Sequence, residues 1–481
     1  MAASRTASPA GGEGDSFLER WFKLRAHGTN VRTELLAGLT TFMVMAYIIA
    51  VNPATLTFNG QLTTIQVATV TCLVSGVMSI VMGLYTNRAV ALAPGLGLNA
   101  VVAYTFVGSM GLSFPEAMGI VIAEGIVITL LVLTGVRQYV LEAIPLELKR
   151  AISVGIGLFI LFLGLKNAGV ITFMTGSDAS SATSGGILEL TPLNTWPIFV
   201  ALVGLVITIV MMAMGIRAAI LWGLLASTVI AFIVPGDVTS FPKHPFAGPD
   251  FSLVGQFSFH FIAKLGILSS VLAVLSFMLA DFFDTMGTLI GVGGQAGYLD
   301  EDGQLPDAEK PLLVDSLAAI AGGATSASSA TTYVESAAGV SVGGRTGLVV
   351  VVTGALFLLS LPFVALVEAI PSVATAPALI VVGFLMVGVL SEKETVGADG
   401  RVRKTGAIQF GDIEEGLPVV LTMMVMPFTM SITNGIGVGF ISYVLVKVAR
   451  GKAREIHPAV YIVAAAFLVY FLRWALFDAK F

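Results

Sequence analysis

Charged side chains are scarce in this chain. They make up 11% of its 481 residues, against about 25% in an ordinary soluble domain, whereas hydrophobic residues make up 56% and the mean hydropathy is +0.93. Apolar runs long enough to cross a hydrocarbon core of about 30 Å recur along the whole chain. These runs exclude a soluble core and an outer-membrane barrel. The sequence therefore predicts an all-α polytopic membrane protein.

Cysteine is almost absent as well. Cys72 stands alone and can form no disulfide within the chain, so nothing in the sequence depends on an oxidising compartment. The net charge of −5 is too small to suggest a nucleic-acid partner. Residues 1–30 carry charged side chains without a continuous apolar segment, so we expect no cleavable signal peptide.

The distribution of basic residues predicts the topology, because Lys and Arg concentrate in short cytoplasmic loops. Fourteen passes with a cytoplasmic N-terminus leave only Lys166 and Lys243 in outside loops. We therefore predict a multi-pass protein of the inner (plasma) membrane. A last apolar segment, 458–477, is left over and is expected to lie in the interface. The basic residues that this topology places on the cytoplasmic side are Arg88, Arg137, Lys149, Arg150, Arg217, Lys310, Arg345, Lys393, Arg401, Arg403, Lys404, Arg450, Lys452 and Arg454.

An internal repeat is visible in the sequence. The tetrapeptide EAIP occurs at 142–145 and again at 368–371, each time before an apolar helix that contains glycine. The third and tenth segments, around 90–108 and 330–343, both begin in β-favouring or proline-broken sequence and become helical part-way. Seven segments separate the two EAIP copies. Because seven is an odd number of membrane crossings, the copies lie on opposite faces of the membrane. This pattern predicts a 7+7 inverted repeat, the architecture of secondary transporters, with a site near mid-membrane where the broken helices meet.

Two aspartates stand in the otherwise apolar eighth segment. Asp281 and Asp284 are three residues apart, so they share one face of a helix. An ionised Asp at mid-membrane costs about 2.5–3.5 kcal/mol on insertion scales, so such groups face a partner or a watery cavity. The alternative is that they only hold helices together. The hydroxyl of Thr285 beside them favours a polar cavity.

The tenth and third segments supply the other candidate binding residues. Glu335, followed by Ser336, stands where an extended stretch becomes a half-helix, and the alternative to a binding role is simple N-terminal capping. In the third segment, Gly95 and Gly97 allow the backbone to approach a ligand, and Asn99 offers an amide donor and acceptor. The alternative for the glycines is helix packing.

Other polar residues rank lower as site candidates. Glu124 lies in the apolar fourth segment but has no polar neighbour in sequence and no helix break. His260 and Lys264 stand at the start of the eighth segment, where an interfacial position is expected. Pro94 suits the first position of a helix.

The candidate residues indicate the chemistry of the substrate. No Lys or Arg falls inside a predicted span, and Arg345 just past the tenth segment is the nearest exception. The substrate is therefore expected to be neutral or cationic, and carboxylates that accept paired N–H donors suit a planar heterocycle. A desolvated carboxylate could also take up and release a proton. Asp281, Asp284 and Glu335 are the candidates, so substrate binding and proton coupling would share residues. No catalytic residue, metal or cofactor is predicted; the expected driving force is a proton gradient.

Four motifs together resemble the azaguanine-type purine permeases of the nucleobase–ascorbate transporter group, related in fold to the uracil permease. They are APGLGLNA, ADFFDTMGTLIGVG, ESAAGVSVGGRTGL and GDIEEGLPVVLTMMVMPFTMSI. The resemblance spans about Glu34 to His457. It implies proton-coupled import of guanine, hypoxanthine or adenine, an elevator-like motion, and often a homodimer. It also implies a division into a cytoplasmic tail 1–32, a core domain (33–136 and 258–368), a gate domain (137–257 and 369–457) and a C-terminal helix (458–481).

The resemblance also implies roles for individual residues. Glu335 corresponds to the substrate-binding glutamate of the tenth segment, the pair Asp281 and Asp284 to the acidic site of the eighth, and Asn99 to the asparagine of the third. The motif does not say which aspartate contacts the base and which handles the proton. The uracil-permease branch has a histidine one turn after its acid, where this chain has Thr285.

The same residues bear on three rival functions. An anion permease of the same fold, as in sulfate and bicarbonate carriers, is disfavoured by three acids without a buried base. An intramembrane aspartyl protease needs its two acids on facing helices, whereas Asp281 and Asp284 share one helix. A cation channel fits broken helices around one central site less well than alternating access does.

Overall fold

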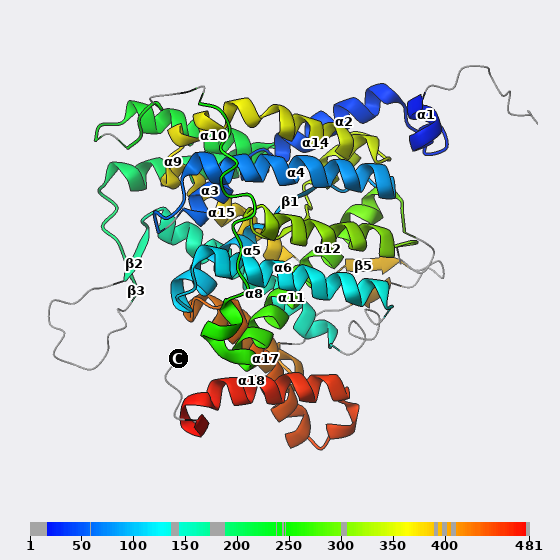
Figure 1. The fold of residues 1–481 in the computed structure, drawn as a ribbon, viewed down its shortest axis with the longest axis vertical. Helices are drawn as coiled ribbons and strands as arrows, with labels where there is room; N and C mark the ends of the chain where they lie inside the picture. Colours follow the sequence, from blue (N-terminus) through cyan, green and yellow to red (C-terminus); the bar gives the residue numbers. More distant parts are fainter. Residues whose placement is uncertain are drawn as a thin grey trace, which may run out of the picture.

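The computed structural model is a bundle of apolar helices (Figure 1). It describes residues 17–57, 59–135, 144–173, 188–236, 238–242, 245, 247–299, 305–388, 393–396, 402–405 and 410–477. Among the predicted features, Glu142 and Ala143 of the first EAIP copy lie outside the described residues, as do Arg137, Lys243 and Arg401.

The helices follow one another with few interruptions. Those of the first half are α1 (Phe17–Phe22), α2 (Val31–Met45), α3 (Ile48–Leu56), α4 (Thr64–Thr86), α5 (Leu96–Ala100), the π-helix η1 (Val101–Ser109), α6 (Phe114–Leu133), α8 (Leu146–Asn167), α9 (Trp196–Ala213) and α10 (Ala219–Ile233). Those of the second half are α11 (Phe261–Ala296), α12 (Glu309–Ala324), α13 (Ser336–Ser341), α14 (Leu348–Leu359), η2 (Leu361–Ala369), α15 (Ser372–Val387), α16 (Ile413–Phe428), α17 (Ile432–Ala449), η4 (Ala453–Glu455) and α18 (Pro458–Phe477).

The apolar helices confirm a polytopic helical membrane protein. In the described part of the chain, seven helices are long and apolar enough to cross a membrane, and an eighth crossing results if the bent pair of α14 and η2 is counted as one. Four more apolar helices are shorter, including the stretch Leu96–Ser109 and α15. The count of fourteen passes stays a prediction.

Helix contacts follow the pattern of an inverted repeat. α4 packs against α14, and α6 packs against α12. In a repeat of seven segments α4 corresponds to α12, and α6 corresponds to α14. The α4–α14 contact in one order of the repeats is therefore the α12–α6 contact in the other. Likewise α8 packs against α16, and α9 against α15. Figure 1 shows α4, α12 and α6 running side by side.

Glycines allow close packing of α4 against α14 and of α6 against α12. A Cβ atom on Gly83 of α4 would lie 2.3 Å from the carbonyl oxygen of Gly347, at the start of α14. A Cβ atom on Gly125 of α6 would lie 2.9 Å from the backbone nitrogen of Ile320 in α12. Small residues at such positions are typical of membrane helix interfaces, where close backbone packing replaces the hydrophobic effect as the source of attraction.

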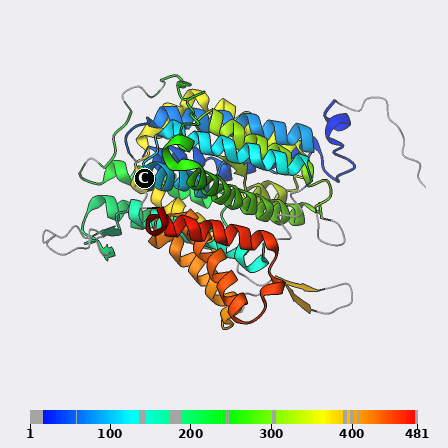
Figure 2. The same ribbon diagram turned by 60° about the horizontal axis from the view of Figure 1, so that its bottom comes forward.

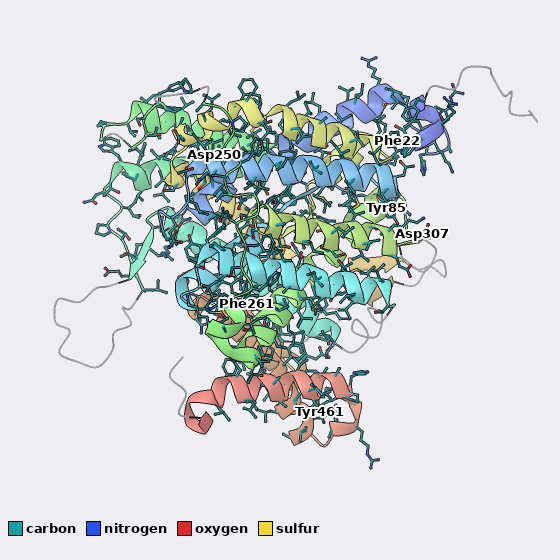
Figure 3. The ribbon with its side chains drawn as sticks, in the orientation of Figure 1. Phe22, Tyr85, Asp250, Phe261, Asp307 and Tyr461 are labelled. Carbon is teal, nitrogen blue, oxygen red and sulfur yellow. The ribbon has the colours of Figure 1, made fainter. Side chains whose placement is uncertain are left out.

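One end of the molecule carries the loops predicted to be cytoplasmic. The end of α4 and the start of α12 meet there, where Figure 3 labels Tyr85 and Asp307. The Arg88 guanidinium donates to the carbonyl of Pro306 over 3.1 Å and lies over the ring of Tyr298, 4.5 Å from its centroid.

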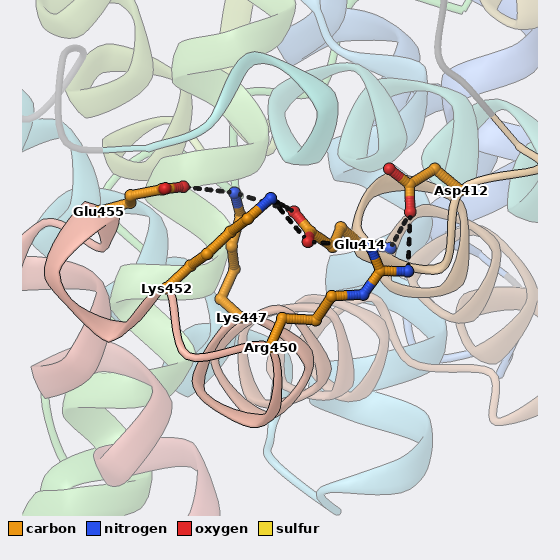
Figure 4. A network of polar contacts seen from close by, with 6 residues as sticks. All are labelled: Asp412, Glu414, Lys447, Arg450, Lys452 and Glu455. Carbon is orange, nitrogen blue, oxygen red and sulfur yellow. Dashed lines mark hydrogen bonds and ion pairs between the residues drawn. The ribbon is translucent and has the colours of Figure 1, made fainter.

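A second group of polar contacts joins α16 to the end of α17. We call it the Glu414 cluster; Figure 4 shows Asp412, Glu414, Lys447, Arg450, Lys452 and Glu455. The Glu414 carboxylate lies 2.8 Å from Nζ of Lys452, 3.3 Å from Nζ of Lys447 and 3.2 Å from a nitrogen of Arg450. The cluster fixes the start of α16 against the chain that leads into α18.

α18 packs against α17 and also reaches α11. Its buried face carries Val460, Ala464 and Phe467, and Ile462 on another face is 71% exposed. α18 runs roughly parallel to α6 in Figures 1 and 2, and Figure 2 shows it beside α16 and α17, away from the blue helices α2 and α4. The interfacial position expected for this helix from the sequence stays a prediction.

Candidate functional site

The two broken segments meet through a short pair of strands at the centre of the fold. β1 (Leu92–Pro94) pairs antiparallel with β4 (Ala330–Thr332), in the register Leu92 to Thr332 and Pro94 to Ala330. The half-helices α5 and α13 begin just after these strands. The predicted strand and half-helix arrangement is thus confirmed in both segments. Pro94 ends β1 instead of opening the helix, so that expectation was wrong: Gly95 precedes α5.

Glu335 lies at the point where β4 turns into α13. Its side chain forms no capping hydrogen bond with that helix, so the simple capping role is not what the structure shows. The carboxylate instead accepts a hydrogen bond of 2.6 Å from the hydroxyl of Tyr47, which is buried at the bend between α2 and α3. Glu335 itself stays partly exposed. Sequence analysis missed Tyr47.

The two aspartates of α11 have different surroundings. Asp281 is fully buried, and its Oδ2 accepts a hydrogen bond of 3.0 Å from the hydroxyl of Ser329. Asp284 is partly exposed and is close enough to Glu335 for the two charges to interact. Asp284 and Glu335 are therefore the partly exposed carboxylates at the strand crossing, whereas Asp281 is buried.

A buried hydroxyl network connects α11 to β4 and α12. Thr285 donates to Oδ2 of Asp315 over 2.8 Å and shares a 2.7 Å hydrogen bond with the hydroxyl of Thr331. The backbone N–H of Thr332 donates to Oδ1 of Asp315 over 3.0 Å. In this structure Thr285 therefore positions other groups and its hydroxyl is occupied. Asp315 was missed by the sequence analysis, although an Asp within the apolar run of α12 was a signal that could have identified it.

The residues of the third segment differ from one another in role. Asn99 is fully buried, and neither polar atom of its amide has a partner in the described part of the protein, so the amide has unused hydrogen-bonding capacity. Gly95 donates its N–H to the carbonyl of Ser329 over 2.9 Å. A Cβ atom on Gly97 would lie 2.5 Å from Cγ2 of Ile156 in α8. The structure thus supports helix packing, the alternative weighed for Gly97.

The side chains of Ser336 and Arg345 form hydrogen bonds with backbone groups. The Ser336 hydroxyl accepts a 2.9 Å hydrogen bond from the N–H of Ala91. The Arg345 guanidinium donates to the carbonyls of Val340 and Gly344 over 2.6 and 2.7 Å, at the C-terminal end of α13. Cations are favoured at that end of a helix, so Arg345 stabilises the half-helix without pairing with the site acids.

Two features lie away from this site. His260 and Lys264 each lie 3.2 Å from the carboxylate of Glu116, at the starts of α11 and α6. A cavity of about 570 Å³ lies between α11, α6 and α18, and its lining is almost wholly apolar, with residues such as Val271, Leu275 and Val463. It offers no carboxylate or amide to a nucleobase, so the strand crossing and not this cavity is the candidate site.

Comparison with known proteins assigns the family. The xanthine/uracil permease model, described as a permease family, matches residues 32–408. The chain belongs to this family. The Adenine permease AdeQ of Escherichia coli (strain K12) is 40% identical over 94% of this chain and 95% of its own length. The Guanine/hypoxanthine permease PbuG of Bacillus subtilis (strain 168) is 36% identical over 95% of this chain and 99% of its own length. The family and these relatives are permeases, that is, transporters and not enzymes.

Solved structures agree on the fold. The transmembrane domain of the cyanobacterial bicarbonate transporter BicA has a TM-score of 0.60 at 14% identity, covering 85% of this chain and 97% of that domain. The structure of SLC26A9 has a TM-score of 0.59 at 11% identity, covering 87% of this chain and 66% of that chain. At such identities the likeness shows the permease fold alone.

Proposed function

We propose that this permease imports purine nucleobases, namely adenine, guanine or hypoxanthine, by proton symport. The printed functions of its relatives support the substrate class. The observation that carries the proposal is the pair Asp284 and Glu335: two carboxylates from separate elements, both partly exposed and close enough to interact.

The chemistry of these groups fits a purine. Carboxylate oxygens accept hydrogen bonds from ring and exocyclic N–H groups, and the unpaired amide of Asn99 can both donate and accept. None of the ion pairs in the described ranges includes Asp284 or Glu335. A neutral base with several N–H donors satisfies such a site, whereas an inorganic anion would be repelled by it.

An elevator motion is proposed for the transport step. Helices of the proposed core (33–136 and 258–368) and gate (137–257 and 369–457) meet along α5 and α8, α3 and α15, and α11 and α17. Polar bonds between the two proposed domains would have to break for sliding; among them the Thr105 hydroxyl donates to the carbonyl of Met430 over 3.1 Å, and the Ser326 hydroxyl donates to the carbonyl of Gln256 over 3.0 Å. An inner-membrane location, a cytoplasmic N-terminus and a homodimer belong to the same proposal.

Two rivals fit the geometry less well. An anion permease would need a positive group at the strand crossing, where the structure places carboxylates. An aspartyl protease would need two acids that share a water molecule, but Asp281 is buried behind Asp284, which is partly exposed.

The test is uptake of labelled adenine, guanine, hypoxanthine and uracil in cells that lack purine uptake. We expect the wild type to take up at least one purine, to lose this uptake when a protonophore collapses the gradient, and to lose it through Glu335→Gln. Glu309→Gln, an exposed carboxylate in the first turn of α12, is the matched control at equal expression. Uptake of sulfate or bicarbonate without purine uptake would replace the proposal with the anion permease.

A further inference from the structure

A second pair of carboxyl groups lies behind the proposed purine site. Glu124 of α6 and Asp281 of α11 are both 0% exposed, and the packing of α6 against α11 brings the two carboxyl groups close enough to act on each other. Three of their carboxyl oxygens accept no hydrogen bond from an N–H or O–H group of the described residues: both oxygens of Glu124, and Oδ1 of Asp281.

A hydrogen bond between two carboxyl groups requires a proton. Ionised carboxylates only accept hydrogen bonds, so two of them in contact have no donor to share. One proton between the pair supplies the donor and also removes one of two like charges from a dry interior, where an uncompensated charge is strongly unfavourable. The two groups then behave as one titrating unit.

Among the residues that the structure describes, no Lys, Arg or His forms an ion pair with this pair. α6 packs against both α11 and α12 (Figure 1), and α12 contributes Asp315, a third buried carboxyl that interacts with both members of the pair. None of the ion pairs found in the described segments includes these acids. The titratable and polar groups that act on the pair are Asp315 from α12, Asp284 one turn along α11, Ser329 and Thr331 from β4 and its approach, and Thr285 through Asp315.

We propose that Glu124 and Asp281 form a proton-binding site separate from the purine-binding carboxylates, holding one proton between them. The assignment rests on the proposed proton symport for its role in transport. It divides the acids of the membrane region into two sets: Asp284 and Glu335, which a purine reaches, and Glu124 and Asp281, which only a proton reaches.

The two sites are physically connected. Asp281 is one helical turn from Asp284 and acts on its charge. Asp281 also holds Ser329, whose carbonyl accepts the N–H of Gly95 next to the start of α5. Loss of the shared proton adds a negative charge behind the purine site, so proton binding and purine binding affect each other equally.

The first test reads the proton directly. In purified protein at neutral pH, infrared difference spectra are expected to show the C=O band of a protonated, buried carboxylic acid. Glu124→Gln and Asp281→Asn should each remove it, and Glu309→Gln should leave it in place. This reading does not depend on the transported substrate. A wild type without the band, a band that both variants retain, or a band that disappears on adding Na⁺ at constant pH would overturn the proton site.

The second test reads coupling in proteoliposomes. We expect Glu124→Gln to raise the ratio of purine exchange to proton-driven purine accumulation at least tenfold, because an amide keeps a donor beside Asp281 at every pH. If Gln prevents folding, judged by gel filtration, Asp281→Asn serves in its place. An unchanged ratio in a folded variant would overturn the proposal. Absence of purine transport in the wild type would overturn the proposed function and leave the infrared result to decide the proton site.

Discussion

The phenol oxygen of Tyr47 lies 2.6 Å from Oε1 of Glu335, although 288 positions separate the two residues. Tyr47 stands at the junction of α2 and α3, which begins at the next residue, and its hydroxyl meets the carboxylate of the tenth segment from there. The contact fixes the orientation of the carboxylate that the proposed purine site depends on.

Tyr47→Phe should weaken purine binding without removing Glu335 from the site. A hydrogen bond to a charged group contributes about 1.5–3 kcal/mol, so we expect the Kd for the purine to rise about tenfold or more. Equilibrium binding to purified protein measures the change. Tyr85→Phe, at the exposed end of α4, is the control; equal Kd values for wild type and Tyr47→Phe would show that the hydroxyl does not position Glu335.

Asn99→Leu should separate stability from binding. The Asn99 amide is fully buried without a partner among the described residues, and an unsatisfied buried amide costs about 1–3 kcal/mol. The isosteric Leu removes that cost, so the Tm of the protein without purine should stay the same or rise. Purine affinity should fall about tenfold, and the ligand-induced rise in Tm should shrink. A lower Tm with full affinity would mean that the amide is structural.

Gly97→Ala should slow transport more than it weakens binding. The added Cβ would lie 2.5 Å from Cγ2 of Ile156. At this distance the atoms overlap, so α5 and α8 would have to move apart. The contact joins the proposed core to the proposed gate, so we expect the maximal uptake rate to fall about tenfold with a Kd within about threefold of wild type.

The partner substitution tests the same contact. Ile156→Ala removes Cγ2, so the double variant Gly97→Ala with Ile156→Ala should regain most of the rate. A Gly97→Ala variant with normal rate, or a double variant slower than both single variants, would contradict this role for the glycine.

Glu414→Gln should loosen the start of α16. Three cations surround this carboxylate, at 2.8 Å (Lys452), 3.3 Å (Lys447) and 3.2 Å (Arg450), and the amide leaves them without its charge. Glu414 is buried, but its partners Lys452 and Arg450 are exposed. Ion pairs that reach the solvent contribute little singly, so we expect a fall in Tm of roughly 1–3 °C that shrinks in high salt. Asp307→Asn, which breaks only the exposed pair with Lys310, should change Tm by less; a fall independent of salt would point to packing instead.

The sequence allowed much of the candidate site to be predicted, because membrane burial makes each polar residue conspicuous. Glu335 and Asp284 could be named since ionisable groups in apolar runs are costly. Asp315 carried the same signal and was missed. Glu124 was ranked low for lack of a polar neighbour in sequence; its neighbour is Asp281, which only the packing of α6 against α11 supplies.

The sequence by itself determined that this chain is a helical membrane protein with two broken segments, because apolar length and β-favouring interruptions are local properties that can be seen in the order of the residues. The tertiary structure alone decided what each polar group does. Asp281 and Asp284 look equivalent at three residues apart, yet one is buried against Glu124 and the other stays partly exposed. The contacts of Tyr47 with Glu335 and of Gly97 with Ile156 join residues far apart in the chain, and no local pattern encodes them.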